Sequence, residues 1–213
     1  MFRIGPPGAC MNSEKLKQLG LSGVFLMSAT MAAANGTGAT AAPQAATAQA
    51  VTTTTVPVVH RSMAIDAGFV RFTSSLEQIL GRFPSGVQQD IIKSPKLAEQ
   101  RLKAAEGAQG LMIFSVFDHG AALNMVNVRR NAKQYLIGNP LTAIQMTQHD
   151  IRAALYAPLR VLVYGQGDRR TIVEYDQPSS QFGQFAQTDV TQVARTLDEK
   201  LERVLVQAAD LSR

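Results

Sequence analysis

The sequence predicts an α+β domain in which helices cover one face of a mainly antiparallel sheet. Three patterns indicate this class. Residues 111–117 form a continuous apolar run that is too short for a typical helix and suits a buried strand. Residues 159–165 and 171–175 flank a Gly-Asp turn, as the two strands of a hairpin do. Residues 190–208 carry an apolar stripe at helical spacing and predict a closing helix.

The first half of the domain is expected to begin with a strand at residues 87–93, whose apolar part is a pair of adjacent isoleucines. A helix is predicted next, because Ser94 suits an N-cap and Pro95 suits the first helical position, where no backbone N–H is needed. The continuous apolar run then forms a central strand, and we expect Phe114 to lie in its core.

A third strand is expected at residues 134–138, because the following Asn-Pro pair would end it. A short helix is predicted to start from caps within residues 147–150 and to end at residue 155, ahead of the hairpin. The expected order is therefore strand, helix, four strands, helix.

Residues 1–34 are expected to be a cleavable export signal. Two lysines precede an apolar run over residues 19–34, which ends in Ala32-Ala33-Ala34, a pattern that signal peptidases accept. The run is shorter than the roughly 20 residues that a membrane-crossing helix needs, and an uncleaved anchor is the alternative. We expect a mature protein that begins near Asn35, is periplasmic or secreted, and has no stable membrane insertion.

Two further segments precede the main domain, which is expected at residues 86–213. Residues 35–57 are almost entirely small or polar, show no apolar periodicity, and are expected to form a flexible tether. Residues 58–85 are expected to form an appendage with one short helix, because residues 74–77 fit a capping box.

Charge and cysteine content exclude several classes of protein. The formal charge is +5, of which residues 1–34 contribute +2, so the mature chain carries only +3. Nucleic-acid binders usually concentrate more positive charge, and no nucleic-acid partner is expected. The only cysteine, Cys10, lies in the expected signal, so the mature domain has no disulfide and no thiol nucleophile.

Five short motifs occur in an order that resembles one known family, the domain of unknown function 302. They are Gly86 to Pro95, Phe117-Asp118-His119, Ile137 to Pro140, and residues 157–164 and 174–178. The resemblance covers about residues 86–180. It implies a fold of the TATA-binding-protein type, with the order strand, helix, four strands, helix. The family has no agreed activity, and a fold shared with a DNA binder does not imply DNA binding.

The candidate ligand-binding residues are Asp118, His119, Asn139, Arg129 and Arg130. An imidazole beside a carboxylate could act as an acid/base or contact a ligand, whereas Asp118 could instead cap a short turn from residue 120. Guanidinium forks match carboxylates and phosphates, although a solvated loop is the favoured interpretation of the arginine pair. The Asn139 amide could contact a ligand or merely form a turn.

No metal or cofactor is expected. The three histidines, His60, His119 and His149, lack a ligand spacing with one another. Methionines 112, 125 and 146 could bind copper(I), but scattered methionines usually fill gaps in a core.

Three functions remain open from the sequence. The favoured one is a module that binds a small ligand or an envelope protein, with a homodimer left open. The second is an enzyme that uses His119 as acid/base, which we consider less well supported because no third catalytic group is evident. The third is a non-catalytic envelope scaffold. Convergence of the candidate residues on one concave pocket would favour binding or catalysis over the scaffold.

Overall fold

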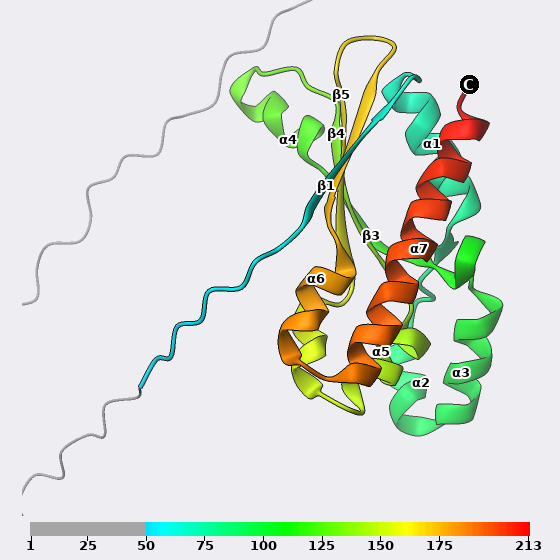
Figure 1. The fold of residues 1–213 in the computed structure, drawn as a ribbon. Helices are drawn as coiled ribbons and strands as arrows, with labels where there is room; N and C mark the ends of the chain where they lie inside the picture. The colour runs from blue at the N-terminus through cyan, green and yellow to red at the C-terminus, as the bar shows by residue number, and fades with distance from the viewer. Residues whose placement is uncertain (1–49) are drawn as a thin grey trace, which may run out of the picture. The chain divides into compact units, whose positions relative to one another are not determined.

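A six-stranded sheet organises the part of the chain that the structure, a computed structural model, describes: residues 50–213 (Figure 1). The expected signal and residues 35–49 of the expected tether lie outside the described residues. Residues 52–213 form a single unit.

The strands are β1 (His60–Ile65), β2 (Gly81–Arg82), β3 (Met112–Asp118), β4 (Ala132–Gly138), β5 (Leu159–Gly165) and β6 (Thr171–Asp176). The α-helices are α1 (Phe69–Ile79), α2 (Val87–Lys93), α3 (Pro95–Ala104), α4 (His119–Leu123), α5 (Pro140–Thr147), α6 (Pro178–Phe182) and α7 (Thr188–Leu211). The 3-10 turns are η1 (Ala108–Gly110), η2 (Asn124–Val126), η3 (Ile151–Tyr156) and η4 (Gly183–Phe185).

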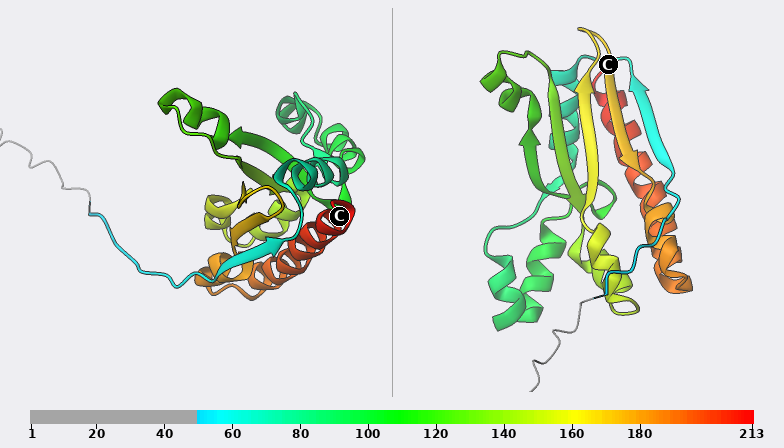
Figure 2. Two further views of the ribbon diagram at one scale, coloured as in Figure 1. Left: turned by 90° about the horizontal axis from the view of Figure 1, so that it is seen from above. Right: turned by 90° about the vertical axis from the view of Figure 1, so that its left-hand side faces the viewer.

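The strand order is β1-β6-β5-β4-β3-β2, and every pair is antiparallel except β2 with β3. The long helices α1 and α7 cover one face of this sheet (Figure 2). The main core lies between that face and the two helices, where Phe72 and Leu76 of α1 meet Leu201 and Leu205 of α7. The α+β class with a mainly antiparallel sheet is therefore confirmed.

The expected strand at residues 87–93 is wrong: this segment is helix α2. Gly86 precedes the helix with a left-handed φ of 74°, a conformation that glycine adopts without strain. Val87 is fully buried against Ala98, Leu102 and Met112 in a second, smaller core cluster. The pair of isoleucines suggested a strand, but tertiary packing of one helical face overrides that local preference. The predicted order of strand, helix, four strands and helix still holds, but its first strand is β2 and not residues 87–93.

Residues 58–85 are more than an appendage. Strand β1 pairs with β6 along all of its six residues, and α1 packs on α7. The helix begins at Phe69, so the predicted capping box at residues 74–77 lies inside it, where Ser75 is buried. Sequence reasoning missed this because the strand His60–Ile65 is an edge strand with mostly exposed residues and little apolar alternation.

The sheet has two ends, and different helices and turns lie at each (Figure 1). At the pocket end, β4 runs into α5 and β5 begins, and helices α2, α3, α5 and α6 gather there. At the hairpin end, β3 runs into α4 and the β5–β6 turn closes the hairpin. Within the described chain, no helix has the length and apolarity needed to cross a membrane.

Candidate functional site

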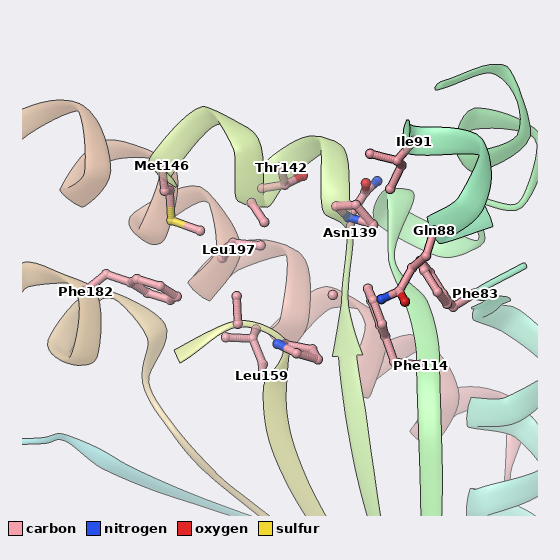
Figure 3. Close-up of a pocket in the computed structure, with 15 residues that line it drawn as sticks. Phe83, Gln88, Ile91, Phe114, Asn139, Thr142, Met146, Leu159, Phe182 and Leu197 are labelled. Carbon is pink, nitrogen blue, oxygen red and sulfur yellow. The ribbon is translucent and has the colours of Figure 1, made fainter. Parts of the chain in front are cut away.

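The candidate site is an apolar pocket of about 240 Å³ at the pocket end of the sheet (Figure 3). It lies where the ends of β3, β4 and β5 meet helices α2, α5, α6 and α7. Its lining is Phe83, Gln88, Ile91, Phe114, Gly138, Asn139, Pro140, Thr142, Ala143, Met146, Ala157, Pro158, Leu159, Phe182 and Leu197. Most of these side chains are aliphatic or aromatic, which is typical of a small-molecule pocket.

One wall of the pocket is aromatic. The rings of Phe83 and Phe114 are stacked, with centroids 4.5 Å apart and planes 14° from parallel. The expectation that Phe114 lies in the core is wrong, because this side chain is only half-buried and faces the pocket. The register of β3 against β4 shifts between Ile113 and Ser115, and such a bulge re-aims the side chain within it.

The opposite wall belongs to the main core (Figure 3). Met146 of α5, Phe182 of α6 and Leu197 of α7 line it, and their exposed fractions are 1%, 0% and 4%. Phe182 also makes an edge contact with Tyr156, with ring centroids 6.0 Å apart. These side chains are held by close packing on their far side, so this wall has a fixed shape without a ligand.

The pocket contains neutral polar groups but no titratable side chain. Gln88 of α2 and Thr142 of α5 contribute an amide and a hydroxyl, and Figure 3 shows the Gln88 amide beside Phe114. Because no carboxylate, imidazole, amine or guanidinium lines it, the pocket has no group for acid/base chemistry.

Asn139 lines this pocket, but its own hydrogen bonds are structural. Its Oδ1 accepts a hydrogen bond from the Leu141 backbone N–H at 2.8 Å and caps α5. Its Nδ2 donates to Glu106 Oε1 at 2.6 Å and to the Gly110 carbonyl at 2.7 Å. With both amide hydrogens used, Asn139 fixes the start of α5 and so positions one side of the pocket.

The structure separates Asn139 from the other four candidate residues. Asp118 pairs with Lys133 across the β3–β4 ladder, and Asn139 lies six residues farther along the chain, directly after β4. At about 3.3 Å per residue in a strand, the two are separated by about 20 Å. The five residues therefore do not form one site.

Asp118, Arg129 and Arg130 do come together, at the hairpin end. They line a polar hollow of about 550 Å³. We define the polar hollow by its six polar side chains: Asp118, Asn124, Arg129, Arg130, Asn131 and Asp168.

Among the described residues, Asp118 and His119 make no hydrogen bond with each other. Asp118 Oδ1 accepts the Ala121 backbone N–H at 2.8 Å, so Asp118 caps α4, as the structural interpretation of this residue predicted. His119 is exposed, and its ring makes an edge contact with Phe117 at 4.7 Å between centroids. It lines neither the apolar pocket nor the polar hollow.

A partly buried polar network that the sequence did not suggest joins α1 to β4. Glu77 Oε1 accepts hydrogen bonds from Lys133 Nζ and from the Tyr135 hydroxyl, both at 2.9 Å. Burial acts to raise the pKa of Glu77, but the hydrogen bonds from Lys133 and Tyr135 outweigh it, so this pKa is lowered. Burial and the Glu77 carboxylate both raise the pKa of Tyr135. The tyrosine stays protonated, and the network is structural.

A second polar cluster lies on the open face of the sheet and ties edge strand β1 to β6. His60 Nδ1 lies 3.0 Å from Asp176 Oδ1, and its Nε2 lies 3.7 Å from Glu174. The hydrogen bond to Asp176 raises the pKa of His60. Among the described residues, no three His, Asp or Glu side chains are grouped so as to hold a metal ion. Met125 is exposed, whereas Met112 and Met146 are buried in different clusters.

The pocket residues that sequence reasoning missed come from several separate elements, with two on α2, four on α5 and one each on α6 and α7. Val87 and Ile91 are four residues apart, the spacing of one helical face, and this signal could have identified α2. Phe83 and Phe182 lie in short segments without periodicity, so only the tertiary structure reveals their part in the pocket.

Comparison with known proteins identifies the same family that the order of the five sequence motifs indicated. Residues 87–208 match the family described as "Domain of unknown function DUF302". A crystal structure of an uncharacterized conserved DUF302 protein from Bacillus stearothermophilus is similar to this chain, with a TM-score of 0.50 and 14% sequence identity. The similarity covers 72% of this chain and 98% of that one, and at this identity it shows a shared fold alone. No curated protein sequence is significantly similar to this chain.

Proposed function

The chain belongs to the family described as domain of unknown function DUF302, and we propose that it binds a small, uncharged, largely apolar ligand in the apolar pocket. One observation carries the proposal: a pocket of about 240 Å³ has aromatic and aliphatic walls and only neutral polar groups. Typical pockets for drug-sized molecules measure about 300–1,000 Å³, so this ligand is smaller, such as a single fused ring or a short chain.

The chemistry of the walls supports this ligand class. A flat ring fits beside the Phe83–Phe114 stack, because aromatic rings gain from offset stacking in addition to area burial. The Gln88 amide offers both a donor and an acceptor at that wall, which would orient one polar atom of the ligand. A charged ligand is disfavoured, because a desolvated charge here would find no opposite charge.

The position of His119 favours a binding function over a catalytic one. This residue carried the enzyme hypothesis, and its side chain is exposed at the hairpin end, outside the apolar pocket. An acid/base must come within about 3 Å of the reacting group, directly or through one water. The scaffold hypothesis differs from binding in one measurable respect, since it requires no ligand in the pocket.

The binding experiment uses indole, an uncharged fused ring with one N–H donor. The protein has no tryptophan, so indole fluorescence excited beyond the tyrosine absorption band reports the probe alone. We expect the emission to shift to shorter wavelength on titration with the protein. The substitution Ala143→Phe fills the pocket and should weaken binding at least about tenfold, because a closed cavity no longer accepts the ring.

The matched control is Ile144→Phe, one residue away. Ile144 is 56% exposed and does not line the pocket, so this variant should keep the wild-type affinity within about twofold. Absence of indole binding by the wild type, or equal binding by the two variants, would contradict the proposal. Mass spectrometry of protein purified from its native compartment then identifies the retained ligand.

We also propose that the protein works in the periplasm or outside the cell. The support is the sequence pattern of residues 1–34, with two lysines, an apolar run and the Ala32-Ala33-Ala34 end. N-terminal sequencing of the exported form should give a chain that begins near Asn35. A membrane-embedded product that retains the apolar run would contradict this location.

A further inference from the structure

The polar hollow at the hairpin end is independent of the apolar pocket and has a different chemistry. Three parts of the chain that are distant in sequence form it: the segment from Asp118 to Asn131, the β5–β6 turn, and Phe69 at the start of α1. Two arginines, two aspartates and two asparagines supply its side chains. The formal charges of these side chains cancel. Whether the hollow can bind a ligand therefore depends on how the charges are arranged.

The backbone that carries the two arginines is held in place on both sides. A Cβ atom at Gly120 would lie 2.3 Å from the Arg130 carbonyl oxygen, so only glycine permits this close approach. The Asn131 carbonyl accepts a hydrogen bond from the Gly165 N–H at 2.9 Å. These contacts fix Arg129 and Arg130 against the start of α4 and the end of β5.

The β5–β6 turn is fixed against the start of α1 in the same way. The Thr171 hydroxyl is buried and donates to the Ala67 carbonyl at 2.8 Å. A Cβ atom at Gly68 would lie 2.9 Å from the Asp168 carbonyl oxygen. Asp168 therefore lines the same hollow as the arginines, on a backbone that the start of α1 holds in place.

The charged groups of the hollow are available to a ligand. Among the described residues, neither Arg129 nor Arg130 has a carboxylate within ion-pair distance. Asp168 has no side-chain partner there either, and Asp118 uses only one of its two oxygens to cap α4. The hollow thus brings two guanidinium groups and two carboxylates into one lining.

We propose that the polar hollow binds a small ligand that carries both an anionic group and hydroxyl groups, of which a phosphorylated polyol is the type. The arginine pair takes the phosphate, because guanidinium forks match its oxygens with paired hydrogen bonds. Asp118 and Asp168 accept hydrogen bonds from the hydroxyls. A bare anion satisfies only the arginines and meets repulsion from the two carboxylates, so it binds more weakly.

The test uses glycerol 3-phosphate and inorganic phosphate as probes, with binding measured by calorimetry on the full chain. We expect the wild type to bind glycerol 3-phosphate more tightly than inorganic phosphate. The double substitution Arg129→Gln with Arg130→Gln should weaken glycerol 3-phosphate binding at least about tenfold, because two charged hydrogen-bond donors are lost.

The chain provides a control with the same change in charge. Arg169 and Arg170 form a second exposed pair, beside the hairpin turn but outside the lining of the hollow. Arg169→Gln with Arg170→Gln should change the affinity by less than about twofold. Asp168→Asn should weaken glycerol 3-phosphate binding but leave inorganic phosphate binding as it is or strengthen it.

Three results would overturn the proposal. The first is no binding of glycerol 3-phosphate by a folded wild type. The second is an equal loss in the two arginine variants, which would indicate general attraction to surface charge. The third is equal affinity for glycerol 3-phosphate and inorganic phosphate, which would remove any role for the carboxylates. Indole binding should be unaffected by all of these variants, because the two linings share no residue, so this test and that of the apolar pocket fail separately.

Discussion

The two ends of the same sheet show how differently a concave surface can be made. At the pocket end, buried side chains of α5, α6 and α7 form walls that are also part of the hydrophobic core. At the hairpin end, turns and short loops carry exposed polar side chains around a wider hollow. A change at the first end therefore alters folding and binding together, whereas a change at the second end can alter binding alone.

The largest expected loss of stability follows a substitution at the pocket end. Phe182→Ala removes a fully buried ring that both packs in the core and lines the pocket. The variant should lose roughly 3–5 kcal/mol of unfolding free energy, as large buried aromatics do. Phe117, which is 55% exposed at the hairpin end, is the matched control, and Phe117→Ala should cost less than about 1 kcal/mol. Urea unfolding curves measure both, and similar losses would contradict the contrast between the two ends.

A smaller loss of stability is expected for a substitution of Glu77, on the helix-covered face of the sheet. Glu77→Gln should cost about 1–3 kcal/mol at neutral pH, because Lys133 and Tyr135 lose a charged hydrogen-bond acceptor. The pKa of Glu77 is lowered by folding, so its contribution is present above the ordinary carboxyl pKa and is lost as the pH falls through the lowered value.

The control for that prediction is Glu99→Gln. Glu99 makes an exposed pair with Lys103 at 2.6 Å within α3, and surface pairs of this kind contribute little. Urea unfolding at several acidic pH values should show a smaller dependence on pH for Glu77→Gln than for the wild type and the control. Parallel curves for all three proteins would show that Glu77 is not coupled to folding.

The smallest effect is expected at His119, the residue that sequence reasoning placed first. Its ring is exposed and packs edge-on against Phe117, so His119→Gln should change stability by no more than about 0.5 kcal/mol. Indole binding should be unchanged as well. A loss of indole affinity in this variant would mean that the two ends of the sheet are coupled, and the comparison between them would need revision.

The sequence by itself determined the features that depend on local pattern. The apolar run of β3, the β5–β6 hairpin and the stripe of α7 are recognisable because strands and helices repeat every two and every 3.6 residues. The cap at Asp118 was also predictable, because backbone N–H groups at a helix start need a local acceptor. The start of α3 at Pro95 was predictable because the first helical position needs no backbone N–H. The family was predictable from five motifs in order.

Only the tertiary structure decided which residues share a site. Asp118 ends β3 and Asn139 follows β4, but these strands are antiparallel, so their carboxyl ends point in opposite directions. The apolar pocket combines Phe83, Met146 and Phe182, which belong to separate short segments and carry no common pattern in the sequence. Helix α2 formed against the local preference of its isoleucines because burial of Val87 in a core cluster contributes more free energy than strand propensity does. Local pattern follows from the geometry of the backbone, whereas a site depends on contacts between distant segments that exist only in the folded chain.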